Sequence, residues 1–317
     1  MPALPISVLV PTRNSRQQLP AHVASVRALV PLVQEIVVVD SESADGTVEY
    51  LRKEFAGAPV RFLTHPPGLY ESWNFGVNAC AAEFVYIATV GDSITAEGLQ
   101  KLAATALRFK CDAVISPPRL LDASGAPVKK RWPVFELIDA LNLRAPAALE
   151  PEDTLLFAMA FMRMAILGSS ASNLYRAETL RVRPFPTDFG HGGDVGWGLR
   201  NGAAIRLGVV PEVVSTFVFH PRAKREVENA GAMRVEESRA ALARARSAIS
   251  AESASLGERL CDAWQRLFEL NQRRRQTNFW MVRPRAWRDR NAQQQAAQTV
   301  MKLQREVLLR IRSRTIA

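Results

Sequence analysis

The sequence predicts an α/β protein built on a mostly parallel sheet with helices on both faces. Short apolar runs at 6–11, 36–40 and 84–88 are rich in Val and Ile, as in strands that are buried on both faces of a parallel sheet. Segments with helical spacing of apolar residues separate the runs, which is the alternation of βαβ units. Right-handed crossovers bring the carboxyl ends of parallel strands to one edge. We therefore expect Asp40 and Asp92, which follow two of the runs, to stand in one crevice.

The elements of the N-terminal hundred residues follow from local signals. Pro11 should end the first strand, because proline lacks the N–H that a ladder needs, and the polar turn 12–15 follows it. Apolar residues then recur three or four positions apart over 19–30, which indicates a helix. The same reasoning gives the remaining elements in order: a strand at 36–40, a loop at 41–47, a helix at 48–55, a strand at 60–63, a helix at 70–80 and a strand at 84–88.

The next hundred residues are predicted more coarsely. Pro127, Pro133 and Pro146 indicate an irregular insertion over 126–150. The other expected elements are a helix lined by 99–106, a strand at 113–115, an apolar helix at 154–167, a return strand at 170–176, a short helix opened by Asp194, and strands at 204–207 and 213–219. We expect the apolar helix to belong to the core; the alternative is a surface for lipid or acceptor, which a segment this short favours less.

The turn at 89–92 is the most informative stretch. Gly91 permits a backbone turn that a side chain would obstruct, and Asp92 then places a carboxylate just past a strand end. In an open parallel sheet, ligands bind at that edge. The alternative is that Asp92 only caps the helix that begins near Ala96.

Composition and cysteine content narrow the class. In 317 residues, 48% are hydrophobic and 23% charged, an ordinary globular composition, and no apolar run reaches the length of a membrane span. The N-terminus lacks the basic region of a secretory signal. Cys80, Cys111 and Cys261 lie far apart, which fits a reducing cytosol. We therefore expect a cytoplasmic protein.

The basic charge is concentrated in the C-terminal third. Residues 226–317 hold 18 Lys and Arg against 10 Asp and Glu, a balance of +8 out of the total of +10. Helical patterns dominate this segment, so we expect a domain at 1–225 and a basic helical extension at 226–317. Its amphipathic helices would pack on the domain or on a second subunit; the alternative is peripheral contact with an anionic membrane at the inner face. We expect no nucleic-acid binding, because no recognition module is present.

Several common site motifs are absent from the sequence. It contains neither GxGxxG nor GxxxxGK[ST], and neither HExxH nor GxSxG. The crevice must therefore handle its ligand with carboxylates and backbone amides, with or without a metal ion.

Four segments resemble, in order, the signature blocks of family 2 glycosyltransferases of the GT-A fold. They are residues 7–14, 37–47, 68–76 and 88–93. The acidic block is most similar to the bacterial branch in which it reads Asn-x-Gly-Asp. The resemblance implies binding of a UDP- or GDP-sugar by Pro11, Thr12, Arg13, Asp40, Asp45, Asn74, Gly76, Gly91 and Asp92. Within this set, Pro11, Thr12 and Arg13 would border the base and ribose, and Asp40 would accept a hydrogen bond from the base.

The resemblance also implies a divalent metal, Mn²⁺ or Mg²⁺, held by Asp92. Such hard cations favour carboxylate and phosphate oxygens. This chain has Thr89 and Gly91 where the D-x-D pattern often has further carboxylates. His220 would supply a further metal ligand. The neighbouring Arg222, Lys224 and Arg225 would contact phosphate oxygens.

The catalytic base implied by the resemblance is Asp194, in a block that commonly reads Glu-Asp. Gly193 replaces the Glu, and glycines at 190, 192 and 193 let the backbone close over a ligand. The alternative for Asp194 is a helix N-cap.

The expected reaction follows from these roles. It is metal-dependent, inverting transfer of a sugar to a hydroxyl of a saccharide or glycolipid acceptor, in bacterial surface polysaccharide or glycoconjugate synthesis. The alternative is a non-catalytic nucleotide-binding or scaffold protein of the same fold, since the acidic motif keeps only one Asp.

Overall fold

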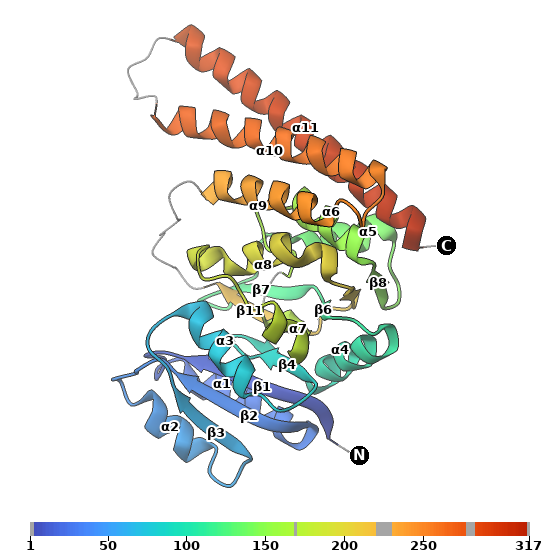
Figure 1. Cartoon of the computed structure of the whole chain (residues 1–317). Helices are drawn as coiled ribbons and strands as arrows, with labels where there is room; N and C mark the ends of the chain where they lie inside the picture. The colour runs from blue at the N-terminus through green and yellow to red at the C-terminus, as the bar shows by residue number, and fades with distance from the viewer. Residues whose placement is uncertain (1–2, 168–169, 220–229, 277–282, 316–317) are drawn as a thin grey trace.

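The computed structural model describes residues 3–167, 170–219, 230–276 and 283–315 (Figure 1). A large sheet carries the N-terminal half, helices cover both of its faces, and three further helices form the C-terminal end of the molecule.

The first four long strands confirm the predicted parallel sheet. They are β1 (Leu4–Thr12), β2 (Val33–Asp40), β3 (Val60–Thr64) and β4 (Phe84–Ile87), ordered β3-β2-β1-β4 and paired in parallel. The strand β1 runs one residue beyond the predicted stop at Pro11, so that Thr12 lies opposite Asp40. Pairing with β4 ends near Leu9, where Ala88 donates to the Leu9 carbonyl. The missing N–H of Pro11 therefore interrupts no bond to β4.

The remaining strands complete a mostly parallel sheet and build a second one. The large sheet continues with β9 (Asn173–Arg176), β6 (Ala113–Ile115), β10 (Leu207–Val209) and β8 (Ala147–Leu149). Here β9 runs antiparallel to both of its neighbours, and β8 is an antiparallel edge strand. The small sheet has the order β5-β11-β7, formed by Ser93–Ile94, Ser215–Phe219 and Pro118–Asp122.

Alternating side chains of β1 serve two separate cores, as a sheet covered on both faces requires. Ile6, Val8 and Val10 pack with one set of helices, whereas Leu9 packs with the other. The helices around the large sheet are α1 (Leu19–Leu29), α2 (Thr47–Glu54), α3 (Leu69–Ala79), α4 (Ala96–Phe109), α7 (Ala177–Val182) and α8 (Gly193–Asn201).

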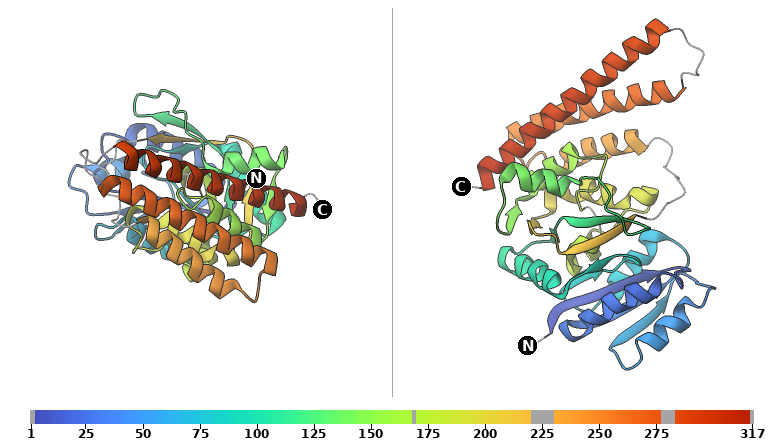
Figure 2. Two further views of the ribbon diagram at one scale, coloured as in Figure 1. Left: turned by 90° about the horizontal axis from the view of Figure 1, so that it is seen from above. Right: turned by 180° about the vertical axis from the view of Figure 1, so that it is seen from behind.

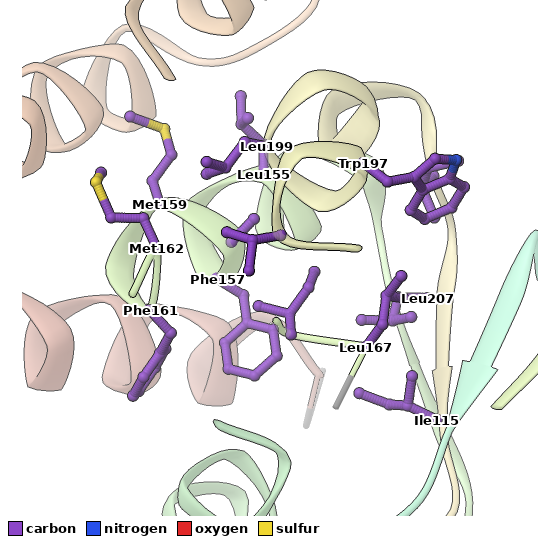
Figure 3. Packing of buried hydrophobic residues seen from close by; sticks show 14 of the residues in the cluster. Ile115, Leu155, Phe157, Met159, Phe161, Met162, Leu167, Trp197, Leu199 and Leu207 are labelled. Atoms are coloured by element: carbon purple, nitrogen blue, oxygen red, sulfur yellow. The ribbon is translucent and has the colours of Figure 1, made fainter. Parts of the chain in front are cut away.

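The apolar segment predicted as core is buried, which confirms that prediction. It forms α6 (Pro151–Ala160) and ends earlier than the predicted 167. Figure 3 shows Leu155 and Phe157 among side chains from α8 and from the sheet, including Leu199 and Ile115. All of these side chains are fully or almost fully buried.

Three segments differ from the prediction. Residues 126–150 are not irregular throughout, because they contain α5 (Pro133–Leu141) and β8. Pro133 stands in the first turn of α5, where no N–H is needed. The return strand at 170–176 begins with the 3₁₀ turn Ser170–Ser172 before β9. The strand predicted at 204–207 lies at β10 instead, after the 3₁₀ turn Gly202–Ala204.

The C-terminal helices pack on the rest of the chain. They are α9 (Ala230–Ala245), α10 (Ala251–Gln276) and α11 (Arg283–Thr315). Figures 1 and 2 show α10 and α11 side by side. The predicted apolar stripe of α11 is buried in the same core as α6, and it consists of Val300, Leu303, Val307, Leu308 and Ile311. Gln304 adds a hydrogen bond of 2.8 Å from its side-chain amide to the Ala160 carbonyl. The apolar stripe of α11 is therefore buried by intramolecular packing. Contact of the C-terminal helices with a membrane or with a second copy of the chain stays a prediction.

None of the described helices combines the length and the apolar character needed to cross a bilayer. The predicted domain boundary at 225/226 falls in residues 220–229, which lie outside the described part of the chain.

Candidate active site

One cavity of about 370 Å³ brings the two central carboxylates together. Asp92, from the turn after β4, and Asp194, from the start of α8, both line it. Asp40 is not among its lining residues. Asp92 and Asp194 therefore share one cavity. The expectation that Asp40 and Asp92 stand in one crevice is not met by this cavity, because Asp40 lies at the end of β2 and does not line it.

The turn that carries Asp92 is held from two sides. Gly91 has φ +98°, the conformation that favours glycine, and the Asp92 amide donates to the Thr89 carbonyl at 3.0 Å. The amide of Val218 on β11 donates to Oδ1 of Asp92 at 3.3 Å. Behind the turn, Nδ1 of His22 donates to the Asp92 carbonyl at 3.2 Å. Burial lowers the pKa of His22, against opposing hydrogen bonds to backbone carbonyls, so this imidazole is neutral at pH 7.

Asp92 is not the cap of α4. Thr95 occupies that position, and its hydroxyl oxygen accepts from the Gly98 amide at 2.9 Å. The side chain of Asp92 is only 4% exposed. This carboxylate lines the cavity at the carboxyl end of a strand, where an open sheet binds its ligands, so its position favours the ligand-binding interpretation.

Asp194 is positioned by Tyr70 of α3. The Asp194 amide donates to the Tyr70 hydroxyl oxygen at 3.1 Å, and that hydroxyl donates to the His191 carbonyl at 3.3 Å. Burial, followed by the negative charge of Asp194, raises the pKa of Tyr70 well above its usual value. The phenol therefore stays protonated. Gly192 occupies the N-cap position of α8, so the N-cap alternative for Asp194 is wrong.

The packing of Tyr70 explains why Gly193 stands where the resemblance leads one to expect Glu. A Cβ at position 193 would lie 2.5 Å from two ring carbons of Tyr70 and 2.6 Å from the Pro186 carbonyl oxygen. Any side chain there would collide with the ring that orients the Asp194 backbone.

The predicted base-binding residues lie at the ends of β1 and β2. Thr12 and Asp40 face each other across the two strands and are both buried. Oδ2 of Asp40 accepts from the Ser43 amide at 2.9 Å. Within the described part of the chain, Oδ1 of Asp40 and the Thr12 hydroxyl have no hydrogen-bond partner. Pro11 is buried beside them, and Arg13 is exposed at the start of the loop.

Asp45 braces the loop that follows β2. Its Oδ1 accepts from the Thr47 amide at 3.1 Å and from the Thr47 hydroxyl at 2.6 Å, and its Oδ2 accepts from the Arg16 amide at 3.0 Å. The hydrogen bond from Thr47 is the largest of the effects that lower the pKa of Asp45. Its carboxylate is thus engaged in holding two loops together.

Two predicted donor-binding residues on α3 have packing contacts instead of a place in the cavity. A Cβ on Gly76 would lie 2.4 Å from Leu9, so this glycine lets α3 approach the sheet. Asn74 bonds both the amide and the carbonyl of Phe185, at 2.9 and 2.8 Å. The donor roles of Asn74 and Gly76 stay predictions, and the α3 side chains that line the cavity are Leu69, Tyr70 and Trp73.

The cavity has an aromatic wall that was not predicted from the sequence. Trp132 precedes α5, and Phe217 and Phe219 lie on β11. The ring centroids of Trp132 and Phe217 are 5.2 Å apart, and those of Phe217 and Phe219 are 4.9 Å apart. The available signal was the i, i+2 spacing of Phe217 and Phe219, which places both on one strand face.

Cationic side chains also line the cavity and were not predicted. They are Lys130, Arg163 and Arg234, with His191 beside them. The predicted phosphate contacts Arg222, Lys224 and Arg225 lie outside the described residues, as does the predicted metal ligand His220.

Among the described residues, no three His, Cys, Asp or Glu side chains cluster as metal ligands. Asp92 fits a divalent ion that is shared with a substrate, because Mg²⁺ typically binds one or two carboxylates together with substrate phosphates. The donor set in the structure is therefore compatible with a metal that arrives with a diphosphate.

Comparisons with known proteins agree with this geometry. The family described as "Glycosyl transferase family 2" matches residues 7–168, about half of the chain. No curated protein matches the sequence.

Solved structures show the same fold. S. aureus TarS 1-349 in complex with UDP-GlcNAc matches with a TM-score of 0.58 at 17% identity, covering 82% of this chain and 71% of that one. The mannosyltransferase PcManGT from Pyrobaculum calidifontis, in complex with GDP-Man and Mn²⁺, matches with a TM-score of 0.50 at 18% identity, covering 81% and 79%. The family match covers most of the large sheet and the acidic turn that carries Asp92. The chain therefore belongs to glycosyl transferase family 2 and is a glycosyltransferase of GT-A fold.

Proposed function

We propose that the protein transfers a sugar from a UDP- or GDP-sugar to an acceptor hydroxyl, with a divalent metal and with inversion at the anomeric carbon. The observation that carries the proposal is the shared cavity of Asp92 and Asp194. One carboxylate then serves the diphosphate side of the donor, and the other serves the acceptor.

The nucleoside of the donor is assigned to the edge formed by β1 and β2. Thr12 and Asp40 each carry a buried oxygen without a hydrogen-bond partner in the described part of the chain. Buried polar atoms normally have partners, and a base with N–H donors supplies one for Asp40. Arg13 and Asp45, at the same loops, would complete this wall. The structures of TarS with UDP-GlcNAc and of PcManGT with GDP-Man support a nucleotide-sugar as donor.

The transfer step is a single displacement. Asp194 accepts the proton of the acceptor hydroxyl while that oxygen forms its bond to the anomeric carbon. The bond from that carbon to the diphosphate oxygen breaks, and its electron pair leaves with the nucleoside diphosphate. Attack from the opposite face inverts the anomeric configuration. When bound at Asp92, Mn²⁺ or Mg²⁺ would offset the charge that develops on the departing diphosphate.

The protein's own contribution is positioning. Tyr70 orients the Asp194 backbone, while His22 and Val218 orient Asp92. Holding the reacting groups in line accounts for a large share of the acceleration in two-substrate reactions.

We also propose a cytoplasmic enzyme of bacterial surface polysaccharide or glycoconjugate synthesis, with a saccharide or glycolipid acceptor. Cys80, Cys111 and Cys261 are all buried free thiols, and burial raises the pKa of each to about 12. Unpaired thiols of this kind are compatible with a reducing compartment.

Asp194→Asn tests the catalytic assignment. The variant should lose at least about 100-fold in transfer rate, because a general base contributes roughly 10² to 10⁴, while donor binding stays unchanged. The matched control is Asp188→Asn, which alters an exposed carboxylate six positions away that does not line the cavity. Transfer is measured by release of nucleoside diphosphate, and donor binding by calorimetry. Full activity in Asp194→Asn would remove this residue from the mechanism.

The scaffold alternative is separated by nucleotide binding. UDP and GDP are titrated with and without Mn²⁺ while the melting temperature is followed. Metal-dependent binding of one nucleotide, followed by turnover of its sugar ester, supports the enzyme. Equal and metal-independent binding of both nucleotides, without turnover, supports a scaffold.

A further inference from the structure

The aromatic wall of the cavity consists of Trp132, Phe217 and Phe219. Phe217 and Phe219 come from one face of β11, and Val218 between them bonds Asp92 through its amide. The wall therefore lies directly beside the acidic turn. Trp132 extends it from the segment that precedes α5. Flat apolar rings next to polar groups are typical of sites that bind ring-shaped ligands.

A cation lies on this wall. Nζ of Lys130 is 5.0 Å from the centroid of the Phe219 ring. Arg163 and Arg234 are two further cations of the cavity: Arg234 of α9 lies beside Gly192, and its Nη1 donates to the Arg163 carbonyl at 3.4 Å. All three side chains line the cavity that holds Asp194. Three positive charges around one cavity favour a ligand that carries negative charge.

We propose that the acceptor is an anionic saccharide, a sugar that carries a phosphate or carboxylate group. Its ring packs against Trp132, Phe217 and Phe219, and its anionic group lies among Lys130, Arg163 and Arg234. This inference rests on the proposed function, and it names the acceptor class of that same site. Guanidinium and ammonium groups bind phosphate and carboxylate oxygens through charge-assisted hydrogen bonds.

The position of the cations favours the acceptor over the donor. The donor's nucleoside is assigned to Thr12 and Asp40, which do not line this cavity, so the donor shares the cavity only through its diphosphate at Asp92. Lys130 is attached to the aromatic wall, and Arg234 stands beside the turn of the proposed base. An acceptor hydroxyl that reaches Asp194 therefore brings its neighbouring groups among these cations.

The test uses the full chain and three sets of acceptors: neutral oligosaccharides, the same sugars phosphorylated, and the same sugars carrying uronic acids. The variants are Lys130→Gln and Arg163→Gln, whose side chains are both exposed. Their controls are Lys129→Gln and Arg144→Gln, which change exposed cations that do not line the cavity. A further pair, Phe219→Leu and Phe135→Leu, compares a ring of the wall with a ring of α5 outside it.

We expect anionic acceptors to be used with at least about tenfold higher kcat/KM than neutral ones. Lys130→Gln and Arg163→Gln should each raise the KM for the anionic acceptor about five- to tenfold, as expected for loss of one charged contact. The controls should stay within twofold. Added salt should raise the same KM in the parent protein. The phosphate and uronate sets distinguish which anion is preferred.

Two results would overturn the inference. The first is an equal kcat/KM for neutral and anionic acceptors. The other is a rise in donor KM in Lys130→Gln and Arg163→Gln with an unchanged acceptor KM, which would assign these cations to the diphosphate. Slow hydrolysis of the donor without acceptor is measured in parallel. Its absence in the parent protein would count against the proposed function itself, separately from the acceptor class.

Discussion

At the scale of single residues, the site depends on the close packing of the Tyr70 ring against Gly193. The ring of Tyr70 fills the space beside position 193, and its hydroxyl bonds the Asp194 amide. A Glu at 193 would have to displace this ring. The chain thus retains the Asp of the block as Asp194. The space that a side chain at position 193 would need is filled by Tyr70, which orients the Asp194 backbone.

Gly193→Ala should destabilise the protein and slow transfer. The added Cβ meets the Tyr70 ring at 2.5 Å, and overpacking of this kind typically costs about 2 kcal/mol. Because the displaced ring also orients Asp194, we expect the transfer rate to fall more than donor binding. Thermal unfolding and steady-state kinetics measure the two effects.

Gly192→Ala is the matched control for this change. A Cβ there meets only the end of Arg234, at 3.7 Å, so stability should stay nearly unchanged. Equal effects of the two substitutions would show that the Tyr70 contact is not what requires glycine at 193.

At the scale of elements, the junction between α6 and α11 is held by Glu152. The carboxylate of Glu152 accepts from the Ser250 amide at 3.0 Å and from Arg314 at 2.7 Å. Burial alone would raise the pKa of Glu152, but hydrogen bonds that include those from Ser250 and Arg314 outweigh it and lower the pKa from 4.5 to about 2. The long C-terminal helix is thus attached to the core by a charge as well as by its apolar stripe.

The attachment should depend on pH. A carboxyl whose pKa is lower in the folded state stabilises it above pH 4.5, and this contribution is lost as the pH falls toward 2. Glu152→Gln should therefore cost about 2 kcal/mol at pH 7, as expected for hydrogen bonds to a charged group. The difference between variant and parent should shrink below pH 4.5. Urea unfolding at pH 7, 5 and 3 measures it.

The comparison with the parent at each pH removes the contributions of other titrating groups, including Asp153, whose pKa is raised by burial. Glu252→Gln is the control, because Arg310 of α11 pairs with both Glu152 and Glu252, and Glu252 is 79% exposed. An exposed pair of this kind contributes little. A pH-independent cost in Glu152→Gln would contradict the charge-based explanation.

At the scale of the whole molecule, the C-terminal helices share a core with the glycosyltransferase fold. Ile311 of α11 is fully buried, in the same cluster as residues of α6 and of the large sheet. The basic composition of the C-terminal third therefore describes the outside of helices whose inner faces complete the domain.

Ile311→Ala should lower the free energy of unfolding of the whole protein by about 3 kcal/mol, as cavity-forming substitutions do. Leu309→Ala, on the same helix at a position that is 62% exposed, should change it by less than about 0.5 kcal/mol. Calorimetry measures both. A separate low-temperature transition in Ile311→Ala, with the main transition unchanged, would mean that α11 unfolds independently.

Much of the fold could be predicted from local patterns, because buried parallel strands and amphipathic helices leave periodic signals. The strands at 36–40 and 84–88 and the turn at Gly91 are examples. Residues 126–150 were missed because a proline at the start of a helix resembles a breaker in sequence. The aromatic wall was missed because Trp132 and Phe217 are distant in sequence and meet only through the packing of β11. The bracing contact of Tyr70 depends on the same kind of long-range packing.

The hydrogen bond from Val218 to Asp92 links the two substrates mechanically. Val218 stands between the two phenylalanines that are assigned to the acceptor, and its amide holds the carboxylate that is assigned to the donor's metal. A shift of this one strand moves both contact surfaces. Any change in affinity that occupancy at one end causes at the other is therefore expected to be equal in both directions, because binding free energies are reciprocal.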